Sequence, residues 1–151
     1  NELKKLKSFT SKGEIITENH VEKHVGISKV FNSFELQKAI GLGQFSKSFQ
    51  IIQYLSRNTK DHPLVMTLAT LHNYFQKLLL LKGVGGNPKL LGINPFFLNE
   101  YKRAALRYNM RQLTFAMEHI MEADLKSKGI SSRNITSKEI LEELLLKLFT
   151  L

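Results

Sequence analysis

The sequence of 151 residues contains no cysteine, and this absence excludes several kinds of site. A chain without thiols has no disulfide framework, no cysteine nucleophile and no cysteine-ligated zinc, and such usage favours a cytoplasmic protein. Long apolar runs are also missing: the longest, Leu78 to Leu81, is flanked by lysines and falls far short of the ~18 residues of a membrane helix. The first residues, NELKKLKSF, lack the apolar stretch of a signal peptide. We therefore expect a cytoplasmic protein with no membrane contact.

Acidic residues are few beside basic ones, since 13 Asp and Glu face 22 Lys and Arg and leave a formal net charge of +9. Such a charge attracts phosphate polyanions, but an ordinary basic protein would have the same composition. There is no polybasic tail of the kind that forms a disordered nucleic-acid-binding arm. The length suffices for one packed domain, or for a domain with a fragment of another.

Catalytic and metal-binding patterns are missing as well. The glycine-rich segment GVGGNPKLLG lacks the Lys-Ser/Thr pair of a phosphate-binding Walker loop. His20 and His24 have the spacing of zinc ligands in metalloproteases, but Val21 stands where the catalytic Glu would be and no third ligand is evident. The remaining histidines and carboxylates form no triad and no acid–base pair. The sequence therefore predicts no catalytic residue, no cofactor and no metal, and we expect a chain that is not an enzyme.

What the sequence does contain is helical periodicity, with almost no alternation typical of strands. In one long helix Leu68, Leu71, Phe75 and Leu78 recur three and four residues apart, which predicts that this helix lies at the centre of a bundle. The fold class is thus all-α, with about five main helices after a short helical remnant. The expected helices span about 17–25, 32–41, 45–58, 63–82, 95–108, 110–128 and 136–151.

Asp124 is the most unusual carboxylate of the chain, because the buried stripe predicted for helix 110–128 continues into it. A lone buried carboxylate is costly, so it needs a cation or backbone donors. Lys128, one turn further, is the local partner, whereas Lys82 or Arg103 would tie two helices together. We expect Asp124 to be at least partly buried and structural, without a catalytic role.

Two further sets of residues are candidates for partner contacts. Lys102, Arg103 and Arg107 lie on helix 95–108; they form either an ordinary solvated face or a surface that contacts DNA phosphates without reading sequence. The last helix contains more leucine than a small bundle can bury, so some apolar side chains should stay exposed as a partner site. Leu146 and Phe149 are the candidates for that subunit interface.

Several segments, in this order, resemble a known family. They are FNSFELQKAIG, HPLVMTLATLHNYFQKLLLLK, NPFFLNEYKRAA, EADLKSKG and the leucine-rich last helix. Their order and spacing resemble the C-terminal part of the delta subunit of the bacterial DNA polymerase III clamp loader, in a style similar to its Bacteroidetes branch. The resemblance implies that residues 1–28 are the end of the AAA+ lid domain and that residues 29–151 are the helical collar domain.

The resemblance also implies a function. Collar domains of the loader subunits pack into a ring, so the expected partners are sister subunits of the gamma/tau and delta-prime types. Delta subunits lack a working ATPase and open the sliding clamp through an N-terminal domain, which this chain would not include, and DNA is met in the assembled complex. The parent holoenzyme is a DNA-directed DNA polymerase that acts in DNA replication. The alternative is a free-standing basic helical domain that binds nucleic acid, which a steep salt dependence of DNA binding would favour.

Overall fold

The computed structural model describes residues 30–83, 91–130 and 134–151. Regular structure in these ranges is helical throughout, with no strand, which confirms the all-α fold class. The elements are α4 (Ser33–Gly41), α5 (Phe45–Arg57), α6 (Leu64–Gly83), the 3₁₀ turn η2 (Pro95–Phe97), α7 (Leu98–Arg107), α8 (Met110–Ser127) and α9 (Ser137–Phe149). The helix expected near 17–25, the histidines at 20 and 24 and the proposed lid remnant 1–28 lie outside the described residues.

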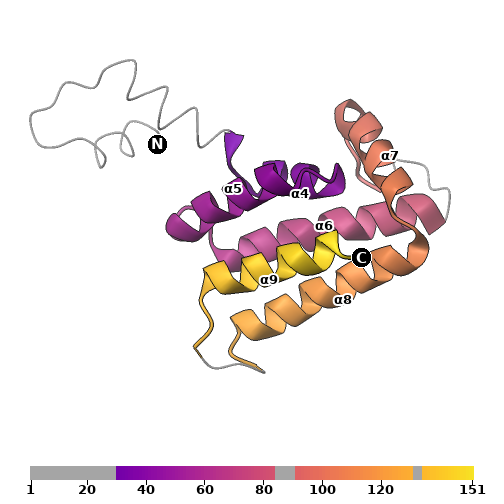
Figure 1. The fold of residues 1–151 in the computed structure, drawn as a ribbon. Helices are drawn as coiled ribbons and strands as arrows, with labels where there is room; N and C mark the ends of the chain where they lie inside the picture. The colour runs from indigo at the N-terminus through magenta and orange to yellow at the C-terminus, as the bar shows by residue number, and fades with distance from the viewer. Residues whose placement is uncertain (1–29, 84–90, 131–133) are drawn as a thin grey trace, which may run out of the picture. The chain divides into compact units, whose positions relative to one another are not determined.

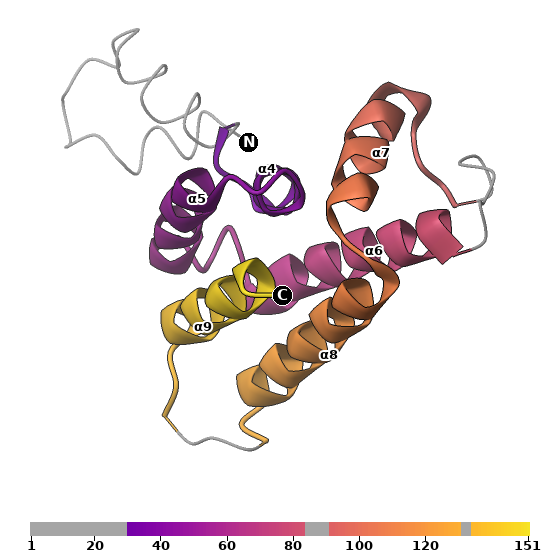
Figure 2. The same ribbon diagram turned by 45° about the vertical axis from the view of Figure 1, so that its right-hand side comes forward.

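The longest helix, α6, lies at the centre of the compact unit that the chain forms from Ser33 onward, and it contacts α4, α7 and α8. Helix α9 packs between α5 and α8 and also touches α4. Figures 1 and 2 both show α8 and α9 side by side, with α7 beside the C-terminal half of α6. Among the described residues, no helix combines the length and the apolar character that crossing a membrane requires.

The predicted core of α6 is confirmed, since Leu68, Leu71, Phe75 and Leu78 are each at most 2 % exposed. The ring of Phe75 makes an edge contact with the ring of Tyr108, with centroids 5.7 Å apart. Aromatic pairs in this arrangement add about 0.5–1.5 kcal/mol to the burial of their surface. This contact joins α6 to the segment between α7 and α8.

Gly41, the last residue of α4, allows the side chain of Tyr74 on α6 to approach closely. A Cβ atom at position 41 would overlap the Tyr74 hydroxyl and lie 2.8 Å from Cζ. Tyr74 is 1 % exposed, and its hydroxyl has no hydrogen-bond partner among the described residues. Burial is the main reason that the pKa of Tyr74 lies well above its ordinary value. The hydroxyl of Tyr108, by contrast, donates to the carbonyl of Ile40 at 3.1 Å.

Local side-chain bonds set the starts of the last two helices. The Asn109 side chain accepts from the backbone N–H of Gln112, whose own side chain accepts from the Asn109 N–H, each at 2.8 Å. Thr136 and Glu139 form the same reciprocal capping box at the start of α9. Each box satisfies two backbone donors that the first turn of a helix leaves unpaired. The caps expected at Asn109 and Thr136 are therefore confirmed.

The helix expected to start at Pro95 differs from the prediction in its first turn. The Asn94 side chain accepts from the N–H of Phe96, and the Asn94 carbonyl accepts from the N–H of Phe97, each at 2.9 Å. These short-range bonds close a 3₁₀ turn over Pro95–Phe97, and the α-helix begins only at Leu98. The exposed Phe96, with 84 % of its surface accessible, stands on this turn.

Candidate functional site

The junction between α5 and α9 has a register fixed at two points. The rings of Phe45 and Phe149 meet edge to face with centroids 5.1 Å apart. About two helical turns away, Gln53 Nε2 donates to Glu142 Oε1 at 2.5 Å. The two helices therefore run antiparallel, and this register sets Phe49 level with the part of α9 between Glu142 and Phe149, which includes Leu146.

Four side chains, Phe45, Phe49, Leu146 and Phe149, form an apolar ridge that we name the α5–α9 seam. Leu146 is 56 % exposed, whereas the other apolar residues of α9 between Ile140 and Leu148 are buried. Phe45 and Phe49 are each 41 % exposed, and Phe149 is half-buried because the ring of Phe45 covers one side of it. Exposed apolar groups gathered in one place are typical of partner surfaces.

The two phenylalanines of the seam belong to an apolar stripe that the sequence shows at helical spacing, together with Ile52 and Leu55. The structure buries Ile52 and Leu55, but it leaves Phe45 and Phe49 41 % exposed and buries Ser48 and Ile51. Ser48 can be buried because its hydroxyl donates to the carbonyl of Gln44 at 2.9 Å. Ser48 is the signal in the sequence that could have located the seam. Because this small residue takes the buried position, the neighbouring Phe49 lies beside the helix contact and stays exposed.

A network of four charges holds α9 against α8. Lys126 reaches Glu143 at 2.6 Å and Glu122 at 3.0 Å, and Lys147 reaches Glu122 at 2.7 Å and Glu143 at 2.8 Å. Hydrogen bonds from Lys147 and Lys126 lower the pKa of Glu122 to about 2. The same lysines, with Lys126 contributing most, lower the pKa of Glu143. Because every charge has an opposite partner, this cluster is a structural clamp that holds α9, one of the two seam helices, against α8.

The three basic residues predicted on α7 are all exposed. Lys102 and Arg103 are adjacent, and Arg107 follows Arg103 by one turn. The guanidinium group of Arg107 lies so close to Gly43 that a methyl group at that position would overlap it. Arg107 is thus held against the turn between α4 and α5, while Lys102 and Arg103 extend into solvent.

Asp124 is half-buried, with 33 % of its side chain exposed, and it pairs with Lys128 at 2.5 Å. The other proposed partners do not reach it: Lys82 Nζ donates to the backbone carbonyls of Ala105, at 2.9 Å, and Tyr108. A cation there also satisfies the C-terminal carbonyls of α7. Asp124 therefore belongs to an ion pair within α8, and it does not tie two helices together.

The buried stripe predicted for α8, which leads through Leu113, Met117 and Ile120 to Asp124, is confirmed in part. Leu113 and Ile120 are buried, whereas Met117 and Asp124 have intermediate exposure and the neighbouring Ala116 and Ala123 are buried. Alanine at the contact lets two helices approach closely, so the longer side chains turn aside. That rotation explains why Asp124 stands at the edge of the helix contact and not within it.

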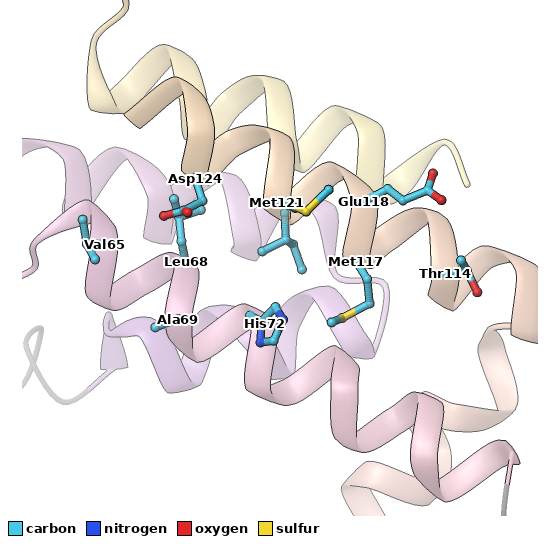
Figure 3. Close-up of a pocket in the computed structure, with 10 residues that line it drawn as sticks. Val65, Leu68, Ala69, His72, Thr114, Met117, Glu118, Met121 and Asp124 are labelled. Atoms are coloured by element: carbon cyan, nitrogen blue, oxygen red, sulfur yellow. The ribbon is translucent and has the colours of Figure 1, made fainter. Parts of the chain in front are cut away.

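The residues that turn aside line an open groove between α6 and α8, with a volume of about 510 Å³. Figure 3 shows that the two helices run antiparallel here, with Val65 at the end where Asp124 stands and His72 near Met117. The groove is lined by Val65, Leu68, Ala69, His72, Thr114, Met117, Glu118, Ile120, Met121 and Asp124. The sequence pattern did not reveal it, because a groove depends on how two helices are rotated against each other.

The lining of the groove is mostly apolar, and its polar side chains are those of His72, Thr114, Glu118 and Asp124. Among the described residues, no three His, Cys, Asp or Glu side chains come together in a way that would hold a metal ion. Comparison with protein-family models, with curated proteins and with solved structures gives no match to this chain.

Proposed function

We propose that this chain is the collar domain of a clamp-loader delta subunit, which assembles with sister subunits during DNA replication. The segments that resemble the family coincide with the helices of the fold. FNSFELQKAIG covers α4, the long apolar segment covers α6, NPFFLNEYKRAA covers η2 and the start of α7, and the leucine-rich end covers α9. An all-α bundle in this order is what the resemblance requires, and the cytoplasm is the expected compartment.

The observation that carries the proposal is the α5–α9 seam. Leu146 and the two phenylalanines of α5 expose much of their apolar surface. Other large apolar side chains of the same two helices, such as Leu55 and Leu145, are buried. Burying an exposed leucine in a partner contact stabilises the complex by about 1.5–3 kcal/mol. In the proposal, the seam packs against helices of gamma/tau or delta-prime type subunits, and the charge clamp holds α9 in place against α8.

A binding experiment with sister subunits tests this function. The chain is mixed with gamma/tau and delta-prime type subunits of the same organism, and complexes are detected by size exclusion with light scattering. We expect a stable complex with the unaltered chain and a weakened one with Leu146→Asp. Leu106→Asp is the matched control, because Leu106 on α7 is 83 % exposed and lies outside the seam. No complex with either subunit type would contradict the proposal.

The second candidate function is binding of nucleic acid through α7, supported by the exposed Lys102 and Arg103 beside Arg107. Such side chains bind phosphates, so the affinity should not depend on base sequence. Removing one phosphate-binding side chain should lower the salt slope of binding by about one unit. Lys102→Gln with Arg103→Gln should therefore flatten the salt dependence of DNA binding by the chain. A steep slope that these changes leave unaltered would reject α7 as the DNA surface.

A further inference from the structure

The groove between α6 and α8 has a charge opposite to that of the chain. Its lining includes two carboxylates, Glu118 and Asp124, and none of the 22 Lys and Arg residues. Within the described part of the chain, Glu118 has no ion-pair partner, whereas Asp124 pairs with Lys128. In a protein of net charge +9, this edge of α8 is locally acidic. A ligand that fits it carries positive charge.

The rest of the groove is apolar and adaptable. Met117 and Met121 line it, two of the four methionines of the chain, with Val65 on the opposite helix. Met121 is 59 % exposed and Val65 is 54 % exposed, so these side chains are available to a partner. Methionine fills irregular gaps and is common on surfaces that accept helices of varied sequence.

The shape of the groove indicates a helix. The lining residues on α8 run from Thr114 to Asp124, ten steps along the helix, which at 1.5 Å per residue is about 15 Å or three turns. Two antiparallel helices form a furrow into which a third helix packs with its own ridge of apolar side chains. A drug-sized molecule needs a site that encloses most of its surface, and side chains as exposed as Met121 do not enclose one.

We propose that the groove between α6 and α8 binds a short amphipathic helix of a partner protein. The apolar side chains of that helix pack on Met117, Met121 and Val65, and one of its Lys or Arg side chains lies beside Glu118. This surface is separate from the α5–α9 seam, so the chain has room for a second partner. The proposal does not depend on the function assigned to the seam.

Two designed peptides serve as probes. Each has about twelve residues, enough for three turns, with leucines on one face. One has lysines at all other positions and the second has glutamates there. Binding of the fluorescent peptides to the full 151-residue chain is measured by anisotropy. The net charge of +9 attracts the glutamate peptide and repels the lysine peptide, so a preference for lysine can come only from local carboxylates.

Three variants locate the binding site. Met121→Lys places a cation in the lining of the groove, and Met66→Lys is the matched control, since Met66 is 63 % exposed on α6 and does not line the groove. Glu118→Lys reverses the charge of the acidic edge. We expect Met121→Lys to weaken the lysine peptide about tenfold or more and Met66→Lys to change its binding less than about twofold. Glu118→Lys should reverse the preference toward the glutamate peptide.

Several results would overturn this proposal. Absence of binding of the lysine peptide to the unaltered chain is one, and equal binding of the two peptides is another. Equal effects of Met121→Lys and Met66→Lys would show that the groove is not where the peptide binds. Self-association of the chain that Met121→Lys abolishes would identify a second copy as the occupant. Circular dichroism of each variant shows that the helices remain folded.

Discussion

The unpaired hydroxyl of Tyr74 gives the sharpest test of the packing between α4 and α6. This hydroxyl is buried and has no hydrogen-bond partner among the described residues, whereas the ring packs against Tyr101 with centroids 5.0 Å apart. A buried polar group without a partner costs about 1–3 kcal/mol. Tyr74→Phe removes the hydroxyl and keeps the ring, so the free energy of unfolding should rise by about 1 kcal/mol.

Tyr108→Phe is the matched control. The Tyr108 hydroxyl is also buried, but it donates to the Ile40 carbonyl at 3.1 Å. Its loss removes a hydrogen bond and leaves that carbonyl without this donor, so Tyr108→Phe should lower the free energy of unfolding by about 1 kcal/mol. The same chemical change is thus expected to have opposite signs at two neighbouring tyrosines.

Gly41→Ala tests the same contact from the other side. In an open helix this change gains about 1 kcal/mol, because alanine is the better helix former. Here the added methyl group would overlap the Tyr74 hydroxyl and lie 2.8 Å from Cζ and 3.0 Å from Cε1. Overpacking of this kind costs about 1–3 kcal/mol, so Gly41→Ala should destabilise the protein. With Tyr74→Phe in the same chain the cost should fall, since the closest atom is gone, and the two changes should be non-additive by about 1 kcal/mol.

Urea unfolding followed by far-ultraviolet circular dichroism measures all four variants, with the free energy taken by linear extrapolation. The reasoning is refuted if Gly41→Ala stabilises the protein. It is equally refuted if Tyr74→Phe and Tyr108→Phe change stability in the same direction by similar amounts.

Three further expectations concern the core, the charge clamp and a helix cap. Phe75→Ala should lower the free energy of unfolding by about 3–5 kcal/mol through reduced burial and a cavity, and an unchanged urea midpoint would show that α6 is not central. Because Lys147 and Lys126 lower the folded-state pKa of Glu122 from 4.5 to about 2, the clamp's contribution is present above pH 4.5 and lost as pH falls toward 2. Urea titrations across that range should show this loss, and Lys147→Met should reduce it; a pH dependence that Lys147→Met leaves unaltered would contradict the assignment. Thr136→Ala should cost about 1 kcal/mol through loss of the capping box, which thermal unfolding detects.

Helix positions could be predicted because their signals are local. The capping pairs at Asn109 and Thr136 and the repeat of large apolar residues in α6 lie within a few turns of sequence, and the structure has them as expected. The faces that the helices bury were harder to predict. Ser48 in α5 and Ala116 in α8 are buried, yet neither stands out in a pattern of large apolar residues. Small residues are favoured where helices approach closely, and which pairs approach is a property of the whole fold.

The candidate site was predictable only in part for the same reason. The exposure of Leu146 follows from the leucine content of α9, which exceeds what one face can bury. The phenylalanines that complete the seam come from α5, far away in sequence; the register between the two helices brings Phe45 beside Phe149, and Phe49 stacks against Phe45. The groove depends on the rotation of α8 against α6, which small side chains decide.

The most direct test of the proposed collar function is the dissociation constant for assembly of this protein with clamp-loader subunits of the gamma/tau and delta-prime types. It is measured for the unaltered protein, for the Leu146→Asp and Phe149→Asp double variant, and for the Leu106→Asp control. A buried charge in the seam should weaken assembly by about 30-fold or more, equivalent to about 2 kcal/mol, while the control keeps the affinity of the unaltered protein. Unchanged affinity of a folded double variant would contradict the claim that the α5–α9 seam is the assembly surface.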